Sequence, residues 1–496
     1  MFESAEVGHT LSKSTFKEVE PDLHHQLLLL QQKLRDSDQA LIIIVSGVEG
    51  AGKGEVVDRL NRWFDTRDVN THAFFDQTDE EVERPRFWRF WRALPPKGTV
   101  GIMFGSWYTQ PIVDRVHKDI DSSTFDRELH QIQDLERMLT RDGNIIVKLW
   151  FHLTEKEQDK RRKQDSKKIS ISRRKASPLL EEYAANYKRF ANASQRAIQL
   201  TDTGAAPWHI IEATDGRYRD ITAGQLIATT LETRLSESST NRTEDLRDVT
   251  LGNGDENRTV LDTIDLTETI SEEDYDRELE SLQHQLHTLT WELHEQKHNA
   301  VMVFEGWDAA GKGSAIRRVT QAMDARLYRV IPIAAPTDEE LSHHYLWRFW
   351  RHVPRAGYVT IYDRSWYGRV LVERVEGFAD RREWLRSYQE INDFEEQLAA
   401  HGASVLKFWL HISPEEQLAR FEARQQDPRK QHKITDEDWR NREKWTDYKL
   451  AVNDMVAHTS TAKAPWTLIP GNDKKLARIK ILKTICERLA DNLRSK

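Results

Sequence analysis

The chain has 496 residues and a formal net charge of -8, with 38% hydrophobic and 31% charged residues. Its 16 Trp, 17 Phe and 12 Tyr exclude a chain that is disordered throughout. No run of about 18 apolar residues predicts a membrane helix, and the N-terminus has no signal-type apolar stretch. The single cysteine, Cys486, excludes an intramolecular disulfide and a cysteine-based zinc site. We therefore expect a cytoplasmic protein of two to four domains that has no membrane partner.

An internal repeat organises the sequence. The glycine-rich segment 47–54 recurs as 306–313, an offset of 259 residues. The same offset relates two further motifs, WRFWR at 88–92 and 347–351 and SWY at 106–108 and 365–367. The sequence therefore predicts two copies of one domain.

The domain boundaries are predicted from a polar, turn-forming stretch between the copies. We expect an N-terminal repeat at 1–235, a linker at 236–258 and a C-terminal repeat at 259–496. Within the repeats, short apolar runs have the pattern of buried parallel strands, and helical spacing of leucines precedes the first of them in each copy. The predicted strands are 41–45, 300–304, 358–362 and 404–410, with a helix at 382–401. This alternation predicts α/β domains.

The glycine-rich segment 306–313 follows a predicted strand and has the G-x-x-x-x-G-K pattern of a P-loop, which wraps phosphates with backbone amides. Lys312 would be the point charge on the phosphates. The usual hydroxyl after the lysine is replaced by Gly313, and a serine follows at 314. We expect Asp308 to ligate a metal ion, because a carboxylate beside phosphates is repelled unless a cation bridges them. The predicted phosphate cradle is Gly306, Gly311, Gly313 and Ser314. The alternative is a glycine-rich turn that binds nothing.

Asp363 ends a predicted strand about fifty residues after the P-loop. The carboxyl ends of parallel strands face the ligand crevice, and a carboxylate there commonly holds Mg²⁺ in phosphoryl transfer. Arg364 follows directly, and Arg369 is a further candidate for phosphate binding. Asp363 and Arg364 could also be an ordinary surface pair, but Asp308 and Lys312 in the same repeat favour a site.

A basic segment follows the strand at 404–410 and has the density of a lid that closes over phosphates. Its candidate residues are Arg420, Arg424, Arg429, Lys430 and Lys433. The first repeat has basic runs at 160–163, 167–168 and 173–175, which could hold a nucleic acid or any long polyanion. Such runs are more often solvated faces than sites, and only their placement favours function.

Three segments closely resemble the polyphosphate kinase 2 family: GWDAAGKGS at 306–314, YDRSWYGRVLVERV at 362–375 and RFEARQQDPRK at 420–430. The resemblance covers most of 266–496 and is weaker in the first repeat. It implies two tandem P-loop kinase domains, each a mainly parallel sheet flanked by helices with a helical lid. It also implies that inorganic polyphosphate and Mg²⁺ are used to phosphorylate nucleotides. The fused two-repeat architecture resembles the class that converts AMP to ADP.

Carried over by motif, the resemblance makes Asp308 and Asp363 the Mg²⁺ ligands, which also activate the acceptor phosphate. Lys312 would bind the transferring phosphates, and Arg364 with Arg424 would stabilise the transition state. The first repeat departs from this set, because Phe104, Gly105, Gln110 and Asp165 stand where the second has Asp363, Arg364, Arg369 and Arg424. We therefore expect a catalytically inactive, or nearly inactive, N-terminal repeat.

The expected partners are inorganic polyphosphate and AMP or ADP, with no specific nucleic acid; a homo-oligomer is a further hypothesis. Three alternatives stay open: a polyphosphate-dependent nucleoside diphosphate kinase, an ATP-dependent nucleotide kinase, and a non-catalytic polyanion-binding protein. No residue distinguishes AMP from ADP as acceptor, so that expectation depends on the fused architecture alone.

Overall fold

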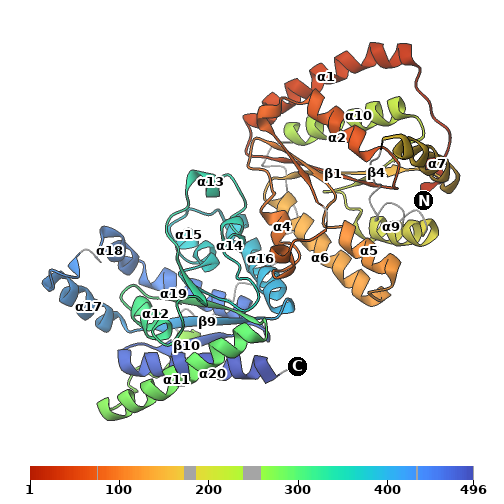
Figure 1. Ribbon diagram of the computed structural model, residues 1–496. Coiled ribbons are helices and arrows are strands. Elements are labelled where there is room, and N and C mark those ends of the chain that lie inside the picture. Colours follow the sequence, from red (N-terminus) through yellow and green to blue (C-terminus); the bar gives the residue numbers. More distant parts are fainter. Residues whose placement is uncertain (75, 173–185, 238–258, 432–433, 495–496) are drawn as a thin grey trace. The chain divides into compact units, whose positions relative to one another are not determined.

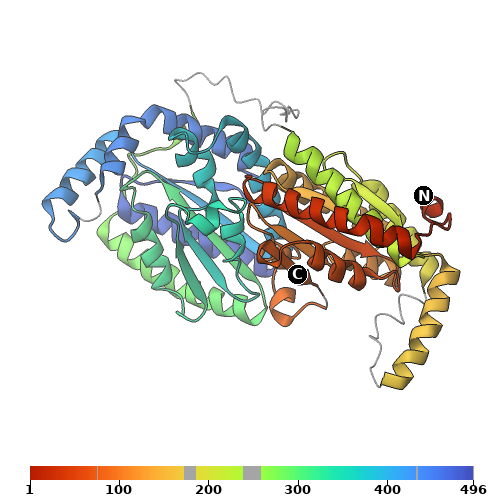
Figure 2. The same ribbon diagram turned by 90° about the horizontal axis from the view of Figure 1, so that it is seen from above.

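The computed structural model describes residues 1–74, 76–172, 186–237, 259–431 and 434–494 (Figures 1 and 2). Lys433, most of the expected linker and the basic run at 173–175 lie outside the described residues, as do the side chains of Lys167 and Lys168. The chain forms two compact units, each described separately below. Unit 1 comprises Met1–Asp76, Arg89–Thr243 and Asp338–His344; unit 2 comprises Gln77–Trp88, Glu244–Thr337 and Tyr345–Lys496.

Unit 1 is built on five parallel strands in the order β2-β3-β1-β4-β5. The strands are β1 (Leu41–Gly47), β2 (Val69–Ala73), β3 (Val100–Phe104), β4 (Ile145–His152) and β5 (Trp208–Glu212). The central strands β1 and β4 are almost entirely buried, because helices cover both faces of the sheet. The strand at 41–45 is confirmed as part of β1.

The helices of unit 1 form a layer on each face of the sheet (Figure 1). One layer contains α1 (Lys13–Arg35), α2 (Lys53–Trp63) and α10 (Gly216–Ser236). The other contains α5 (Thr109–His117), α6 (Ser122–Arg141) and α9 (Tyr187–Thr201), whose three members pack on one another. The basic helix α7 (Glu155–Ser172) stands away from the sheet (Figure 2). Short elements are η1 (Phe2–Ala5), η2 (Thr66–Asp68) and α4 (Trp88–Trp91).

Unit 2 repeats this architecture with the strand order β7-β8-β6-β9-β10, again all parallel. The strands are β6 (Asn299–Gly306), β7 (Tyr328–Pro332), β8 (Val359–Asp363), β9 (Ala403–His411) and β10 (Trp466–Pro470). The central strand β6 leads directly into the glycine-rich loop. The predicted strands at 300–304, 358–362 and 404–410 are confirmed within one or two residues.

The helices of unit 2 also form two layers. One has α11 (Glu272–Glu295), α12 (Lys312–Thr320) and α20 (Lys474–Arg494), and the other has η5 (Trp366–Val370), α15 (Val372–Val375), α16 (Arg381–Ala400) and α19 (Trp445–Thr459). Helices α17 (Pro414–Gln426) and α18 (Asp436–Glu443) stand away from the sheet as a helical lid (Figure 1). Short elements are α3 (Asp79–Val82), η4 (Val260–Thr263) and α14 (Trp347–Trp350), whereas α13 (Asp338–Leu341) belongs to unit 1. The predicted fold class is confirmed.

Strand register makes the two units comparable residue by residue. Leu41 pairs with Val100 in unit 1, and Ala300 pairs with Val359 in unit 2, an offset of 259 in both strands. After the lid the offset becomes 258, since Lys148 pairs with Trp208 and Lys407 with Trp466. Positions that correspond under these offsets are called counterparts below.

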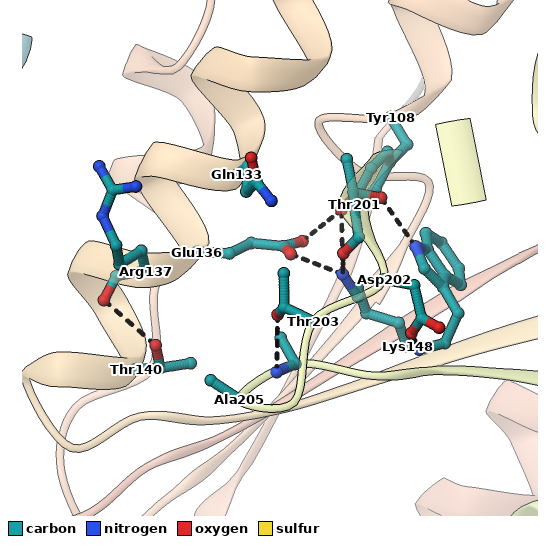
Figure 3. Close-up of polar contacts among 12 residues, drawn as sticks. Tyr108, Gln133, Glu136, Arg137, Thr140, Lys148, Thr201, Asp202, Thr203 and Ala205 are labelled. Atoms are coloured by element: carbon teal, nitrogen blue, oxygen red, sulfur yellow. Dashed lines mark hydrogen bonds and ion pairs between the residues drawn. The ribbon is translucent and has the colours of Figure 1, made fainter. Parts of the chain in front are cut away.

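A buried polar network recurs in both units and ties the sheet to its helices. In unit 1, Lys148 Nζ donates to Glu136 Oε2 (2.6 Å), to the Thr201 carbonyl (2.7 Å) and to the Tyr108 hydroxyl (3.2 Å) (Figure 3). Burial lowers the pKa of Lys148, and the Glu136 carboxylate opposes that shift. The counterparts Lys407, Glu395, Tyr367 and Thr459 repeat these contacts in unit 2. Among the described residues, no helix is long and apolar enough to span a membrane.

Candidate functional site

The glycine-rich loop of unit 2 connects the central strand β6 to helix α12. Gly306 has a φ of +150°, and a Cβ there would lie 2.5 Å from the Leu410 carbonyl oxygen, so only glycine fits. Gly311 caps α12 with a φ of +109°. Lys312 Nζ donates to the loop carbonyls of Gly306 (2.6 Å) and Trp307 (3.2 Å). The loop thus presents a helix N-terminus and a lysine to one point, which is the arrangement of an anion site.

A cavity of about 930 Å³ lies over this loop. Its cationic lining consists of Lys312, Arg317, Arg318, Arg364, Arg420, Arg424, Lys430, Lys474 and Arg478. Its carboxylates are Asp308, Asp363, Glu416 and Asp438. The excess of cations suits a ligand with several negative charges, and the arginines can hold phosphate oxygens bidentately.

Asp308 and Arg364 meet at the edge of this cavity. Arg364 Nη2 lies 3.2 Å from Asp308 Oδ1, and Asn441 on α18 donates to Asp308 Oδ2 at 3.0 Å. Arg364 has a φ of +65°, the left-handed region that non-glycine residues seldom occupy. Its counterpart Gly105 has a φ of +78°. The strained backbone places a guanidinium at the carboxyl end of β8, and such strain is typical of functional sites.

Asp363, Arg424 and Lys430 lie where the sequence analysis expected them. Asp363 is the last residue of β8 and lines the cavity. Arg424 on α17 and Lys430 beyond it also line the cavity, and Lys430 additionally pairs with Asp427 at 2.9 Å. Gly311, Gly313 and Ser314 belong to the same lining, and Gly306 lines a second, smaller cavity that Lys312 also lines.

The guanidinium of Arg420 is bound to main-chain carbonyls, so this residue differs from an arginine that is free to bind phosphate. Its Nη1 donates to the carbonyls of Ala309 and Ala310, both at 3.0 Å, and its Nη2 donates to those of Gly471 and Asn472. The side chain is buried and braces the P-loop against the segment after β10. Its counterpart Arg161 makes the equivalent contacts in unit 1. The geometry therefore indicates that Arg420 shapes the loop.

Arg369 does not line the cavity over the P-loop. Its Nε lies 3.1 Å from Glu373 Oε2, its Nη1 lies 3.8 Å from Glu383, and its guanidinium lies over the Tyr345 ring. These contacts hold it in the helical layer that contains α15 and α16. The structure does not bring Arg369 together with the other predicted site residues.

Sequence reasoning missed four cations of the cavity. Arg317 and Arg318 lie on α12, and Lys474 and Arg478 lie on the first turns of α20. Arg478 donates to the Ser314 hydroxyl at 2.6 Å, which connects α20 to the P-loop helix. These residues form no motif in the sequence. Aligning the two repeats over their whole length would have signalled two of the four, because the counterparts of Arg317 and Arg478 are the acidic Asp58 and Asp220.

Glu305 is a further residue that the motif analysis passed over. Its side chain is buried at the end of β6, and its Oε1 accepts a hydrogen bond from the Ser365 hydroxyl at 2.8 Å. Burial raises the pKa of Glu305, while the nearby Lys312 opposes the shift. Glu305 lines the second cavity together with Asp308, Lys312 and Arg364. Its counterpart in unit 1 is Ser46.

Unit 1 keeps the loop and loses most of the charge pattern. Lys53 Nζ donates to the carbonyls of Gly47 and Val48 and pairs with Glu49 at 3.0 Å. The buried guanidinium of Arg219 donates to the loop carbonyl of Ala51. Of the nine cavity cations of unit 2, the counterparts that stay basic are Lys53, Arg59 and Arg161, and those that become acidic are Asp58, Asp165 and Asp220.

These features define each unit as a P-loop domain, with a parallel sheet whose central strand delivers a glycine-rich loop and a lysine to a phosphate-binding edge. The family model for polyphosphate kinase 2 matches residues 10–239 and 269–496, which is both repeats. The chain therefore belongs to the polyphosphate kinase 2 family.

Full-length relatives share the two-repeat organisation. A polyphosphate:AMP phosphotransferase of Pseudomonas aeruginosa is 46% identical over 486 residues, covering 98% of each chain. One of Acinetobacter johnsonii is 37% identical and covers 94% of each chain. A crystal structure of a Pseudomonas aeruginosa protein described as a polyphosphate kinase 2 matches with a TM-score of 0.90 at 44% identity over the whole of both chains.

Proposed function

We propose that this protein is a polyphosphate:AMP phosphotransferase, which transfers the terminal phosphate of inorganic polyphosphate to AMP and gives ADP. One observation carries the proposal: relatives of that name match the chain over both repeats at 46% identity. The cation-lined cavity over the P-loop of unit 2 supports it, because nine cations against four carboxylates suit a polyanionic donor.

The mechanism requires positioning and charge neutralisation without a covalent intermediate. Lys312 and the amides at the start of α12 hold the phosphates of the donor. Arg364 and Arg424 stabilise negative charge on the phosphoryl group as it passes through a loose transition state. The remaining cavity cations hold the chain so that its end lies against the acceptor, which converts the reaction into an effectively unimolecular step. Arg420 maintains the conformation of the loop through its hydrogen bonds to the loop carbonyls.

Two carboxylates fit a Mg²⁺ ion. Asp308 and Asp363 line the same cavity, and carboxylate oxygens are hard ligands that Mg²⁺ prefers. Mg²⁺ is commonly bound through one or two carboxylates plus substrate phosphates. Within the described ranges, no group of three or more His, Cys, Asp or Glu could hold a metal. Bound there, Mg²⁺ would neutralise charge on the phosphates.

Unit 1 is proposed to be catalytically inactive. Phe104 and Gly105 replace Asp363 and Arg364, so one carboxylate and one guanidinium are lost at the same strand end. The carboxylate of Glu49 neutralises Lys53 at 3.0 Å. The boundaries of the two repeats, 1–235 and 259–496 with the linker between them, are part of this proposal.

A second candidate is a polyphosphate-dependent nucleoside diphosphate kinase. An ADP-polyphosphate phosphotransferase of Pseudomonas aeruginosa is 38% identical over 221 residues, which cover 44% of this chain. That relative matches one repeat only, whereas the AMP-named relatives match both. The two-repeat architecture therefore favours AMP as the acceptor.

The test is a transfer assay with purified full-length protein, Mg²⁺ and long-chain polyphosphate, in which AMP, ADP, GMP and GDP are offered separately. ADP formed from AMP, with no ATP formed from ADP, supports the proposal. ATP formed only from ADP establishes the second candidate. Transfer with ATP as the only effective donor would refute both and indicate a conventional nucleotide kinase.

Two further proposals concern the cellular location and the oligomeric state of the protein. We infer a cytoplasmic location from the single, buried cysteine, which suits a reducing compartment. A homo-oligomer remains a hypothesis, which light scattering of the purified protein tests directly.

A further inference from the structure

Unit 1 carries a basic cavity away from its P-loop. The cavity measures about 440 Å³ and lies where α5, α6 and α9 meet, in the helical layer that Figure 1 shows on one face of the sheet. Its charged lining consists of four cations, Arg115, Lys118, Arg189 and Arg196, and one carboxylate, Asp126. The lining therefore has a clear excess of positive charge.

The counterpart positions in unit 2 carry a different set of charged residues between the equivalent helices. Arg374, the counterpart of Arg115, pairs with Asp454 at 2.8 Å and also donates to the Tyr388 hydroxyl. Asp454 is the counterpart of Arg196. An ion pair between two helices in unit 2 thus corresponds to two arginines that line one cavity in unit 1.

The other cavity positions change in the same direction. Arg189 has the counterpart Asp447, and Lys118 has the counterpart Gly377. The four cations and one carboxylate of unit 1 correspond to one arginine and two aspartates in unit 2. Unit 1 is therefore positively charged at a place where the same fold, in the other repeat, is negatively charged.

The four cations that line this cavity of unit 1 are only partly neutralised by neighbouring groups. Arg196 binds Asp126 through two contacts, at 2.8 and 3.1 Å, and Arg115 donates to the Ser122 hydroxyl and to the Ile120 carbonyl. Lys118 and Arg189 are exposed, and their side chains have no hydrogen-bonded or ion-paired partner within the parts of the chain that the structure describes. Like charges held close together destabilise one another unless an anion lies between them.

We propose that this cavity binds a segment of the inorganic polyphosphate chain, as a docking site on the catalytically inactive repeat. The inference depends on the proposed function for the identity of the polyanion. Guanidinium groups bind phosphate oxygens bidentately, and several of them around one cavity suit a ligand with repeated phosphates better than a single small anion. A docking site raises the effective concentration of long donor chains without taking part in the chemistry.

The variant that tests this site is the double substitution Arg189→Asp and Arg196→Asp. It installs the residues that unit 2 has at the equivalent positions of α19, and the aspartate at 196 gives Arg115 the kind of partner that Arg374 has in unit 2. The matched control is Lys13→Asp with Lys17→Asp, an equal charge change at exposed positions of α1 in the opposite helical layer. Full-length protein is used for all three.

Binding is measured by titration calorimetry with long-chain polyphosphate, without nucleotide, and separately with orthophosphate, AMP and a single-stranded RNA. We expect the wild type and the control to bind polyphosphate at two classes of site, and the Arg189/Arg196 variant to lose one class. Retention of both classes, loss of one class in the control as well, or a loss confined to AMP or RNA would overturn the proposal.

Transfer kinetics give an independent measurement. We expect the KM for long polyphosphate to rise about five- to tenfold in the Arg189/Arg196 variant, with kcat and the KM for chains of about ten phosphates unchanged. An unchanged KM for long chains, or an equal rise for short chains, would overturn the docking role. If the wild type transfers no phosphate from polyphosphate, the proposed function fails, whereas the calorimetric titration still decides whether the cavity binds the polyanion.

Discussion

Replacing Arg364 by glycine separates activity from stability. Arg364 holds a left-handed backbone with a φ of +65°, and its counterpart in unit 1 is already a glycine at +78°. The substitution removes the guanidinium and relieves the strain at the same time. We therefore expect Arg364→Gly to lose activity while unit 2 becomes no less stable.

The backbone conformation and the ion pair of Arg364 set the expected changes in the free energy of unfolding and in kcat. A left-handed conformation destabilises the folded state by about 1–2 kcal/mol at a non-glycine residue. Glycine avoids this strain, but ordering its more flexible backbone on folding costs about 0.5–1 kcal/mol. The ion pair with Asp308 at 3.2 Å is half exposed and contributes less than about 1 kcal/mol. The free energy of unfolding should therefore change by less than about 1 kcal/mol. Loss of one charged donor from the transition state should lower kcat about 100- to 1000-fold.

The assay combines steady-state transfer from polyphosphate to AMP with urea unfolding followed by tryptophan fluorescence. Arg364→Ala is the matched control, because it removes the guanidinium and keeps the strained backbone. It should lose the same activity and be less stable than Arg364→Gly. A glycine variant that keeps more than a tenth of the wild-type kcat, or an alanine variant that is as stable as the glycine variant, would refute this reasoning.

Three further outcomes are expected. Asp363→Asn should reduce transfer to background and Lys53→Ala should leave it within about twofold; the opposite pattern would place catalysis in unit 1. Glu305→Ser should lower kcat about 10- to 100-fold, as loss of a supporting contact does, with KM nearly unchanged, and Glu305→Gln should recover most of it; equal losses in both would contradict a positioning role through Ser365. Burial lowers the pKa of His411 to about 4, below its ordinary value near 6.5, so its neutral form stabilises the fold above pH 6.5 and that contribution is lost as the pH falls toward 4. Urea unfolding should show a loss of about 2 kcal/mol between pH 7 and 5, and a His411→Gln variant with the same pH dependence would exclude this histidine as the cause.

The sequence predicted the centre of each sheet better than its edges. The runs at 41–45 and 300–304 are continuous and apolar, because strands buried on both faces require it. The edge strands β2 and β7 were missed, since Val69–Ala73 is polar and largely exposed and Tyr328–Pro332 ends in proline. Edge strands have a weaker pattern because one side of each is open to solvent.

The placement of the proposed site residues was predictable where a motif supplied it. The spacing of the P-loop placed Lys312 and Asp308, and a strand end placed Asp363. Arg420 lies in the expected region, but its contacts go to the carbonyls of Ala309 and Gly471, because the fold brings the segment after β10 beside the P-loop. No pattern in the sequence around Arg420 indicates that these two segments lie side by side.

The two repeats separate what the fold requires from what the chemistry requires. The network around Lys148 recurs around Lys407 with nearly the same distances, although unit 1 lacks the carboxylate and guanidinium that unit 2 has at the end of β8. Removing one partner of such a buried ion pair costs about 3–5 kcal/mol, so folding alone is sufficient to retain it. A cavity cation such as Arg364 is far less constrained, because a half-exposed arginine can be replaced with little effect on stability. Glu305, Arg364 and Arg478 all lose their chemical character in unit 1 while its sheet stays intact. The buried lysine is therefore a residue of the fold, whereas Glu305, Arg364 and Arg478 belong to the site proposed for unit 2 alone.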